Sequence, residues 1–130
     1  MSSIFSRIIQ GEIPCHKILE DAKFLAFLDI RPIRPGHTLV IPKKEIDYLF
    51  DMDNETLAEM MVFAKRVAGY IRRAVECQRI GVMVAGLEVP HAHIHLVPIV
   101  EILDLNFAKA KPANPQELSQ MAERIRGYVQ

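Results

Sequence analysis

The chain has no net charge, no long apolar run and very little cysteine, and each absence excludes a class of protein. Its 16 basic residues are balanced by 16 acidic ones, so it lacks the positive excess with which proteins coat nucleic acids. No apolar run approaches the ~20 residues that a membrane-spanning helix requires. We therefore expect neither nucleic acid nor a membrane as a partner, although one bound nucleotide would need only a few local donors.

The two cysteines, Cys15 and Cys77, lie far apart and belong to no Cys-x-x-Cys motif or mixed Cys/His cluster. The chain does not begin with the charged and apolar segments of a signal peptide. Disulfides persist mainly in oxidising compartments. Both observations therefore favour free thiols and a cytoplasmic location.

The chain has 130 residues, half of them hydrophobic, which is enough for one domain with a substantial core. We expect a single domain over residues 1–130, with its core at 3–100 and an extension at 101–130 that contains a helix. The predicted fold class is α+β: a mostly antiparallel sheet of about five strands, one long helix packed on it, and a C-terminal helix.

Capping residues and apolar spacing predict three helices. Ser3 is placed to cap a short helix over 3–10, and Asp53 to cap a long helix over 54–76. Residues 114–117 combine a capping asparagine, a proline in the first turn and a carboxylate three positions after the cap, so they begin the last helix. The apolar stripe predicted for the long helix consists of Leu57, Met60, Met61, Ala64, Val67, Ala68, Ile71 and Val75.

Extended runs of apolar and β-branched residues predict the strands. Two prolines and a glycine within residues 31–36 exclude regular pairing there, and 101–113 has no clear periodicity and is predicted to be an ordered loop. The predicted strands cover residues 16–21, 24–30, 37–43, 80–85 and 89–100.

Three histidines, His91, His93 and His95, alternate with apolar residues in the last of these strands. Successive strand residues point to opposite faces, so the imidazoles are predicted to lie together on one face, ~6.5–7 Å apart along the strand. Three interpretations are open. They are a chance histidine-rich strand, a metal site completed by His37 or a carboxylate, and nucleophilic catalysis by a neutral imidazole, whose ordinary pKa is about 6.5.

The third interpretation is favoured by a resemblance to a known family. Residues 91–98 resemble the signature of the histidine triad (HIT) family, His-φ-His-φ-His-φ-φ, where φ is hydrophobic. The stretches 4–14, 26–30 and 35–44 and the long helix also occur in the order found in its Hint-like branch. The resemblance therefore covers roughly residues 3–100.

This resemblance implies an enzyme that acts at the α-phosphate of purine nucleotide conjugates, of the phosphoramidate or acyl-nucleotide type. His93 would attack the phosphorus and form a nucleotidyl-histidine, which water would then hydrolyse. The backbone carbonyl of His91 would hold the His93 ring, and His95 would donate to a phosphate oxygen. His37 matches the fourth histidine of the family and is expected beside the other three.

The family also implies a purine slot, a ribose-binding carboxylate and a homodimer. Asp29 matches the carboxylate, which can accept from two vicinal hydroxyl groups. Dinucleoside polyphosphate hydrolysis, and a non-catalytic nucleotide- or metal-binding regulatory role, are the alternatives. The predicted nucleotide-binding residues are Ile4, Phe5, Ile8, Ile13, Phe27, Asp29, Ile30, Glu88 and Val89.

The chain departs from the family pattern in two places. Where the family has a glutamine and a small polar residue before the triad, this chain has Leu87 and Glu88. An ionised Glu88 cannot donate to a phosphate but could recognise a cationic amine leaving group. Where many bacterial relatives have zinc-binding cysteines and a histidine, it has Ser3, Ser6 and Glu45. We therefore expect no structural zinc and no cofactor.

Overall fold

The helices begin at the predicted capping residues in the computed structural model, which describes residues 2–130. The side chains of Ser3, Asp53 and Asn114 each accept a backbone N–H from the first turn that follows them, which satisfies a donor that has no partner within the helix. The helices are α1 (Ile4–Ile9), α2 (Asn54–Ala74) and α3 (Pro115–Arg126).

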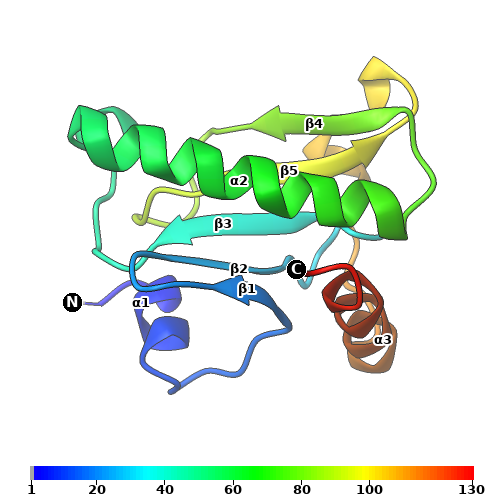
Figure 1. Ribbon diagram of the computed structural model, residues 1–130, viewed down its shortest axis with the longest axis horizontal. Helices are drawn as coiled ribbons and strands as arrows, with labels where there is room; N and C mark the ends of the chain where they lie inside the picture. Colours follow the sequence, from blue (N-terminus) through cyan, green and yellow to red (C-terminus); the bar gives the residue numbers. More distant parts are fainter. Residues whose placement is uncertain (1) are drawn as a thin grey trace.

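Five strands form one antiparallel sheet in the order β1-β2-β3-β5-β4, which confirms the predicted fold class (Figure 1). Apart from the start of the last strand, the strand boundaries agree with the predicted ones to within two residues. The strands are β1 (Lys17–Glu20), β2 (Phe24–Leu28), β3 (Thr38–Pro42), β4 (Arg79–Met83) and β5 (Ile94–Ile99).

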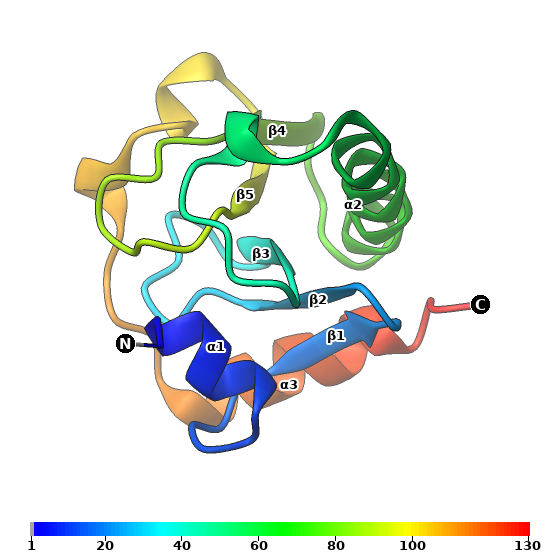
Figure 2. The same cartoon turned by 90° about the vertical axis from the view of Figure 1, so that its left-hand side faces the viewer.

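Helices cover both faces of the central strands, which explains why β2 and β3 are continuous apolar runs. α2 and α3 pack on one face, where Met60, Ile71 and Ile125 are buried against the sheet. α1 packs on the other face through Phe5, against Phe27 and neighbouring apolar side chains. Figure 2 shows α1 and α2 on opposite sides of β2 and β3. This arrangement leaves the start of α1 beside the loop after β3, where Ser3 contacts Glu45, and leaves Phe5 against Phe27 of β2.

The predicted strand over 89–100 is wrong at its start, because β5 begins only at Ile94. Pro90 has no N–H to donate to a ladder. Residue Ala92 instead donates its N–H to the carbonyl of Ile46 at 2.6 Å, in the loop after β3. The alternation nevertheless continues through this segment, since Ala92 and Ile94 are buried in the core beneath α2.

The segment between β5 and α3 is ordered, as predicted, and contains two short 3₁₀ helices, Ile102–Asp104 and Phe107–Lys109. Asp104 is buried and accepts the N–H groups of Val100 and Glu101 at 2.8 and 3.0 Å. These bonds hold the pKa of Asp104 below its usual value. Asp104 therefore anchors the stretch that carries Phe107 back over the sheet.

An apolar groove lies between α2 and the edge strand β4. Met61 was predicted to lie on the apolar stripe of α2 that faces the core, but it is 49% exposed in this groove, beside Val62 and Val82 at 61% and 47%. Phe63 fills the core position instead. Apolar side chains are therefore exposed along one side of the molecule.

Cys15 and Cys77 are both free, and burial raises the pKa of the Cys15 thiol, which makes it a poorer nucleophile. Within residues 2–130, no helix combines the length and the apolar character needed to cross a bilayer. The cytoplasmic location stays a prediction.

Candidate active site

A cavity of about 240 Å³ opens between α1, the end of β2 and the segment that leads into β5. His93 and His95 line it, together with every residue that the sequence predicted to bind the nucleotide. Sequence reasoning missed four residues that complete the apolar wall: Pro14, Cys15, Leu28 and Leu39. The fold brings together all nine predicted nucleotide-binding residues, although their role in binding stays a prediction. They are Ile4, Phe5, Ile8, Ile13, Phe27, Asp29, Ile30, Glu88 and Val89.

Phe5 joins the apolar wall to the histidines. Its ring lies edge-on to Phe27 with the centroids 5.6 Å apart, and to His93 with the centroids 5.1 Å apart. Such edge-to-face packing adds to the area that an aromatic ring buries. α1 therefore forms a wall of the cavity and contacts the proposed nucleophile.

His93 is held by a hydrogen bond of 2.7 Å between its Nδ1 and the backbone carbonyl of His91. A carbonyl can only accept, so Nδ1 carries a proton and donates it. In the neutral ring this leaves Nε2 with a free lone pair. The family resemblance implied this bond, and it is present.

His91 itself does not line the cavity. Its ring is fully buried, and both of its nitrogens are engaged: Nε2 lies 2.8 Å from the carbonyl of Pro42 and Nδ1 lies 2.7 Å from Oγ of Ser3. Because the carbonyl can only accept, Nε2 carries the proton and Nδ1 accepts from the serine hydroxyl. Burial lowers the pKa of His91, which agrees with a neutral ring.

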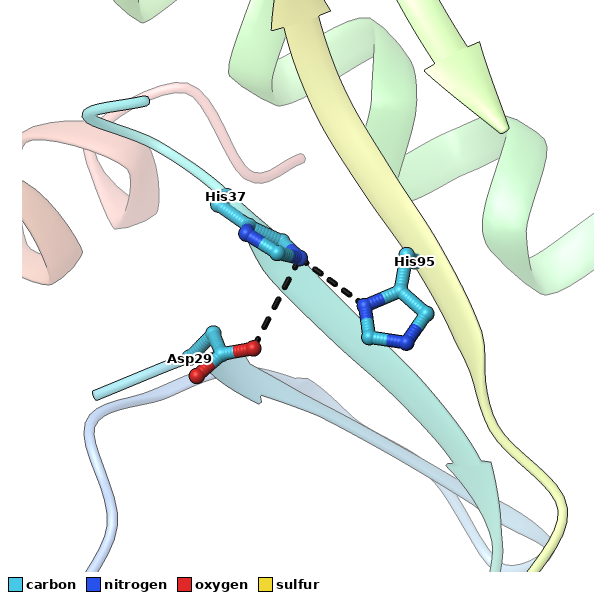
Figure 3. A group of neighbouring side chains, drawn as sticks. All are labelled: Asp29, His37 and His95. Atoms are coloured by element: carbon cyan, nitrogen blue, oxygen red, sulfur yellow. Dashed lines mark hydrogen bonds and ion pairs between the residues drawn. The ribbon is translucent and has the colours of Figure 1, made fainter. Parts of the chain in front are cut away.

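His37 and His95 form a directed pair (Figure 3). The N–H of Ile33 donates to Nδ1 of His37 at 3.0 Å, so the proton of a neutral His37 is on Nε2. That Nε2 lies 2.9 Å from Nδ1 of His95 and donates to it. The proton of a neutral His95 is therefore on its Nε2, where it is available as a donor at the cavity.

Burial keeps this pair neutral, since desolvation disfavours the charged imidazole. It lowers the pKa of His37 to about 4, and together with the smaller effect of the neighbouring imidazoles it lowers the pKa of His95 to about 3. The ring of Phe107 packs edge-on against His95 with the centroids 4.9 Å apart. Around neutral pH, both rings therefore act as hydrogen-bonding groups and not as cations.

Asp29 lies at the end of β2, and one of its oxygens accepts the N–H of Arg31 at 2.9 Å. Its other oxygen lies 3.6 Å from Nε2 of His37 (Figure 3). Burial raises the pKa of this carboxyl. Asp29, His37 and His95 could together hold a metal ion, because their ligand atoms lie within 4.8 Å of one another. A metal would have to replace the proton that now joins the two imidazoles.

The positions that resemble a zinc site carry a hydrogen-bonded network. Oε1 of Glu45 accepts the N–H of Ser3 at 2.6 Å and the hydroxyl of Ser6 at 2.7 Å. These bonds lower the pKa of Glu45 to about 2. Structural zinc is held by cysteine, histidine and carboxylate ligands. Of the positions Ser3, Ser6, Glu45 and His91, two are serines, and both nitrogens of His91 are engaged. The residues present do not fit a zinc ion.

Sequence reasoning missed Phe107, which lies in the segment without periodicity. It lines a second, smaller cavity of about 120 Å³ on the far side of His93 and His95, with residues 85–88. Leu87 in that loop is 92% exposed. Nothing local in the sequence marks Phe107, because only the return of the chain over the sheet brings its ring to His95.

Comparison with known proteins agrees with this geometry. The HIT domain matches residues 10–102 of the chain. The chain belongs to the HIT family. An adenosine 5'-monophosphoramidase of Schizosaccharomyces pombe is 33% identical to it, over an alignment of 136 positions that covers 99% of each chain.

Solved structures of HIT proteins have the same fold. A hypothetical histidine triad nucleotide-binding protein from Sulfolobus tokodaii superposes with a TM-score of 0.87 at 31% identity, covering 97% of this chain and 91% of that one. A zinc-bound histidine triad family protein from Mycobacterium smegmatis has a TM-score of 0.84 at 32% identity, covering 99% and 94%. Residues 91–95 of this HIT protein lie within the segment that the HIT domain matches.

The neutral pair makes the stability of the protein depend on pH. Both histidines have a lower pKa in the folded chain than the ordinary ~6.5, so the unfolded chain binds more protons below that pH. Their contribution to stability is complete above pH ~6.5 and is lost as the pH falls toward the folded values.

We expect the free energy of unfolding, measured with urea, to fall by at least about 2 kcal/mol between about pH 7.5 and about pH 5. His37→Asn should flatten this dependence, because it removes one of the two imidazoles. His16→Gln, which removes a histidine outside the pair, should keep it. An unfolding free energy that is constant over this range contradicts the buried neutral pair.

Proposed function

We propose that this HIT protein hydrolyses purine nucleoside monophosphate conjugates at the α-phosphorus, through a nucleotide bound covalently to His93. The observation that carries the proposal is the arrangement of protons in the cavity. The lone pair of His93 is on Nε2, since Nδ1 donates to the carbonyl of His91, and the neighbouring His95 has its N–H on Nε2. A nucleophile and a hydrogen-bond donor therefore line the same cavity.

The walls of the cavity suit the rest of such a substrate. The apolar side chains of α1 and of the end of β2 form a slot for a flat base, with Phe5 and Phe27 on its surface. One oxygen of Asp29 remains free of backbone partners for the ribose hydroxyls. The phosphate would then lie between this slot and the smaller cavity beside Phe107, which would take the leaving group.

In the first step the lone pair on Nε2 of His93 forms a bond to phosphorus, and the bond from phosphorus to the leaving amine breaks. The electron pair of the broken bond stays on the amine nitrogen, which takes a proton from water, and the hydroxide left by that water is neutralised by the proton released in the second step. His95 donates to a phosphate oxygen as charge develops on it. In the second step water attacks the phosphorus, and the P–N bond to His93 breaks and returns the electron pair to Nε2. The sum consumes one water, which supplies the oxygen on the nucleotide and the proton on the released amine.

The leaving group we favour is an amine. The relative from Schizosaccharomyces pombe is named as an adenosine 5'-monophosphoramidase and matches nearly the whole chain. Glu88 lines both cavities, so its carboxylate lies on the side where a leaving amine would depart. A dinucleoside polyphosphate would bring phosphate charge to the same carboxylate, which makes that substrate the second candidate.

The covalent intermediate is tested by trapping. Brief incubation with radiolabelled adenosine or guanosine 5'-phosphoramidate, followed by denaturation, should leave label on the protein. His93→Ala should abolish the label, because it removes the proposed nucleophile. Label retained by His93→Ala would contradict the assignment. Metal analysis of the purified protein tests the alternative role as a metal-binding module.

The proposed recognition of a cationic leaving group by Glu88 is tested with substrates whose leaving groups differ in charge. Glu88→Gln should lower kcat/KM for a phosphoramidate with a cationic side chain by about tenfold, which corresponds to ~1.4 kcal/mol. It should raise kcat/KM for a dinucleoside polyphosphate, because a repulsive charge is removed. Leu87→Ala, in the same loop, is the matched control for packing. Equal rates of wild type and Glu88→Gln on the cationic substrate would contradict recognition of the amine.

We also propose that the protein is a homodimer that pairs across the groove between α2 and β4. β4 is an edge strand whose outer backbone groups have no partner strand. Met61, Val62, Val82 and Ala68 surround the groove, and its lining is almost wholly apolar. A second copy would bury these side chains and cover the edge.

Val62→Glu should convert the dimer to a monomer, because it places a charge in an apolar contact that excludes water. Sedimentation equilibrium at micromolar concentration gives the molecular mass directly. Arg66→Glu, on the same helix but outside the groove, is the control and should stay dimeric. A wild type of monomer mass at these concentrations contradicts the proposal.

A further inference from the structure

The peptide that holds the nucleophile lies outside the sheet. The strand pairing of β5 begins with Ile94 opposite Val40 and His95 opposite Met83, so no ladder includes residues 89–93. The carbonyl of His91, which accepts from His93, belongs to this unpaired segment. Its direction must therefore be determined by contacts other than the sheet.

The ring of His91 supplies two of those contacts, at opposite ends. Nε2 donates to the carbonyl of Pro42 at the end of β3, and Nδ1 accepts from Oγ of Ser3 at the start of α1. The ring is fully buried between them. A change in the tautomer of His91 would place two acceptors together at Pro42 and would break the contact.

The hydroxyl protons around His91 have only one consistent assignment. Oε1 of the Glu45 carboxylate can only accept, so the Ser6 hydroxyl, 2.7 Å away, donates to it. This occupies the proton of Ser6, whose Oγ lies farther from Nδ1 of His91, at 3.5 Å. Ser3 accepts the N–H of Ser6 at 3.0 Å and keeps its own proton for Nδ1 of His91.

We propose that Ser3 and Glu45 are positioning residues for His93, and we call them with Ser6 the serine–glutamate clamp. Glu45 holds the N–H of Ser3 and the hydroxyl of Ser6, Ser3 fixes His91 as its Nε2–H tautomer, and the fixed ring directs the carbonyl that holds His93. Neither residue touches the substrate. The inference deepens the proposed function, because it explains how the nucleophile is oriented.

The clamp also ties the wall of the base slot to the nucleophile. Ser3 is the N-cap of α1, and Phe5 two residues later packs on His91 and His93 with centroids 5.7 and 5.1 Å away. The same hydroxyl therefore caps the N-terminus of α1 and fixes the tautomer of His91. The arrangement uses two hydroxyls, one backbone N–H, one carboxylate and the ring of His91.

The first test does not depend on turnover. Long-range ¹H–¹⁵N spectra of the imidazoles should show a protonated Nε2 on His91 and a protonated Nδ1 on His93 in the wild type. Ser3→Ala should shift both rings toward mixtures of tautomers, and Ser3→Thr, which keeps a hydroxyl, should restore them. Ser2→Ala is the matched control. Unchanged tautomers in Ser3→Ala would overturn the clamp, as would a protonated Nδ1 on His91 in the wild type.

The second test measures label transfer to His93 at saturating phosphoramidate, where weaker binding has no effect. Ser3→Ala and Glu45→Ala should slow this step by roughly tenfold to a hundredfold, the loss typical of a misplaced reacting group. Ser3→Thr should recover most of the rate, and Asp47→Ala, an exposed carboxylate nearby, should leave it unchanged. Wild-type rates in both clamp variants would overturn the proposal.

Failure of the proposed function gives a different result. If the wild type transfers no label at all, the hydrolase proposal fails, and the tautomers of His91 and His93 in the spectra still decide whether the clamp orients the ring. Glu45→Gln keeps the acceptor oxygen without the charge. If Glu45→Ala does not fold, Glu45→Gln separates the contribution of the acceptor oxygen from that of the negative charge.

Discussion

The hydrogen bond from Nδ1 of His93 to the carbonyl of His91 is the interaction on which the rest of the site depends. It determines which nitrogen of His93 carries a proton and therefore which one is free to react. A carbonyl acceptor serves this purpose better than a side chain would, because it cannot itself become a donor. The base slot and the pair formed by His37 and His95 can serve the proposed reaction only when Nε2 of His93 is the free nitrogen.

Burial determines the charge state of the pair formed by His37 and His95. Desolvation keeps His37 and His95 neutral, and the N–H of Ile33 orders their protons from one end. The result is a donor at His95 that is already oriented before a substrate arrives, which is the condition for effective electrostatic stabilisation. The same burial makes the folded state weaker in acid, so the chemistry and the stability of the protein have one physical origin.

Much of the fold and the site could be predicted locally. Ser3, Asp53 and Asn114 cap helices because their side chains accept N–H groups that lie within the next three residues. The alternation of the histidines with apolar residues predicted their common face even where the strand itself was wrong, because extended backbone alternates whether or not it is paired. Such features need only neighbouring residues, and the family resemblance supplied the nucleotide-binding set.

The sequence by itself therefore determined the helices and the fold class, and the family resemblance indicated most of the residues that line the cavity. The tertiary structure alone decided which nitrogen carries the proton in His91 and in His95, because the partners that decide it (Pro42, Ser3 and His37) lie on other segments of the chain. It also decided that Phe107 contacts His95 and that Glu45 joins the start of α1 to the triad. These contacts bridge long sequence separations, and only the packing of the whole chain brings their members within hydrogen-bonding distance.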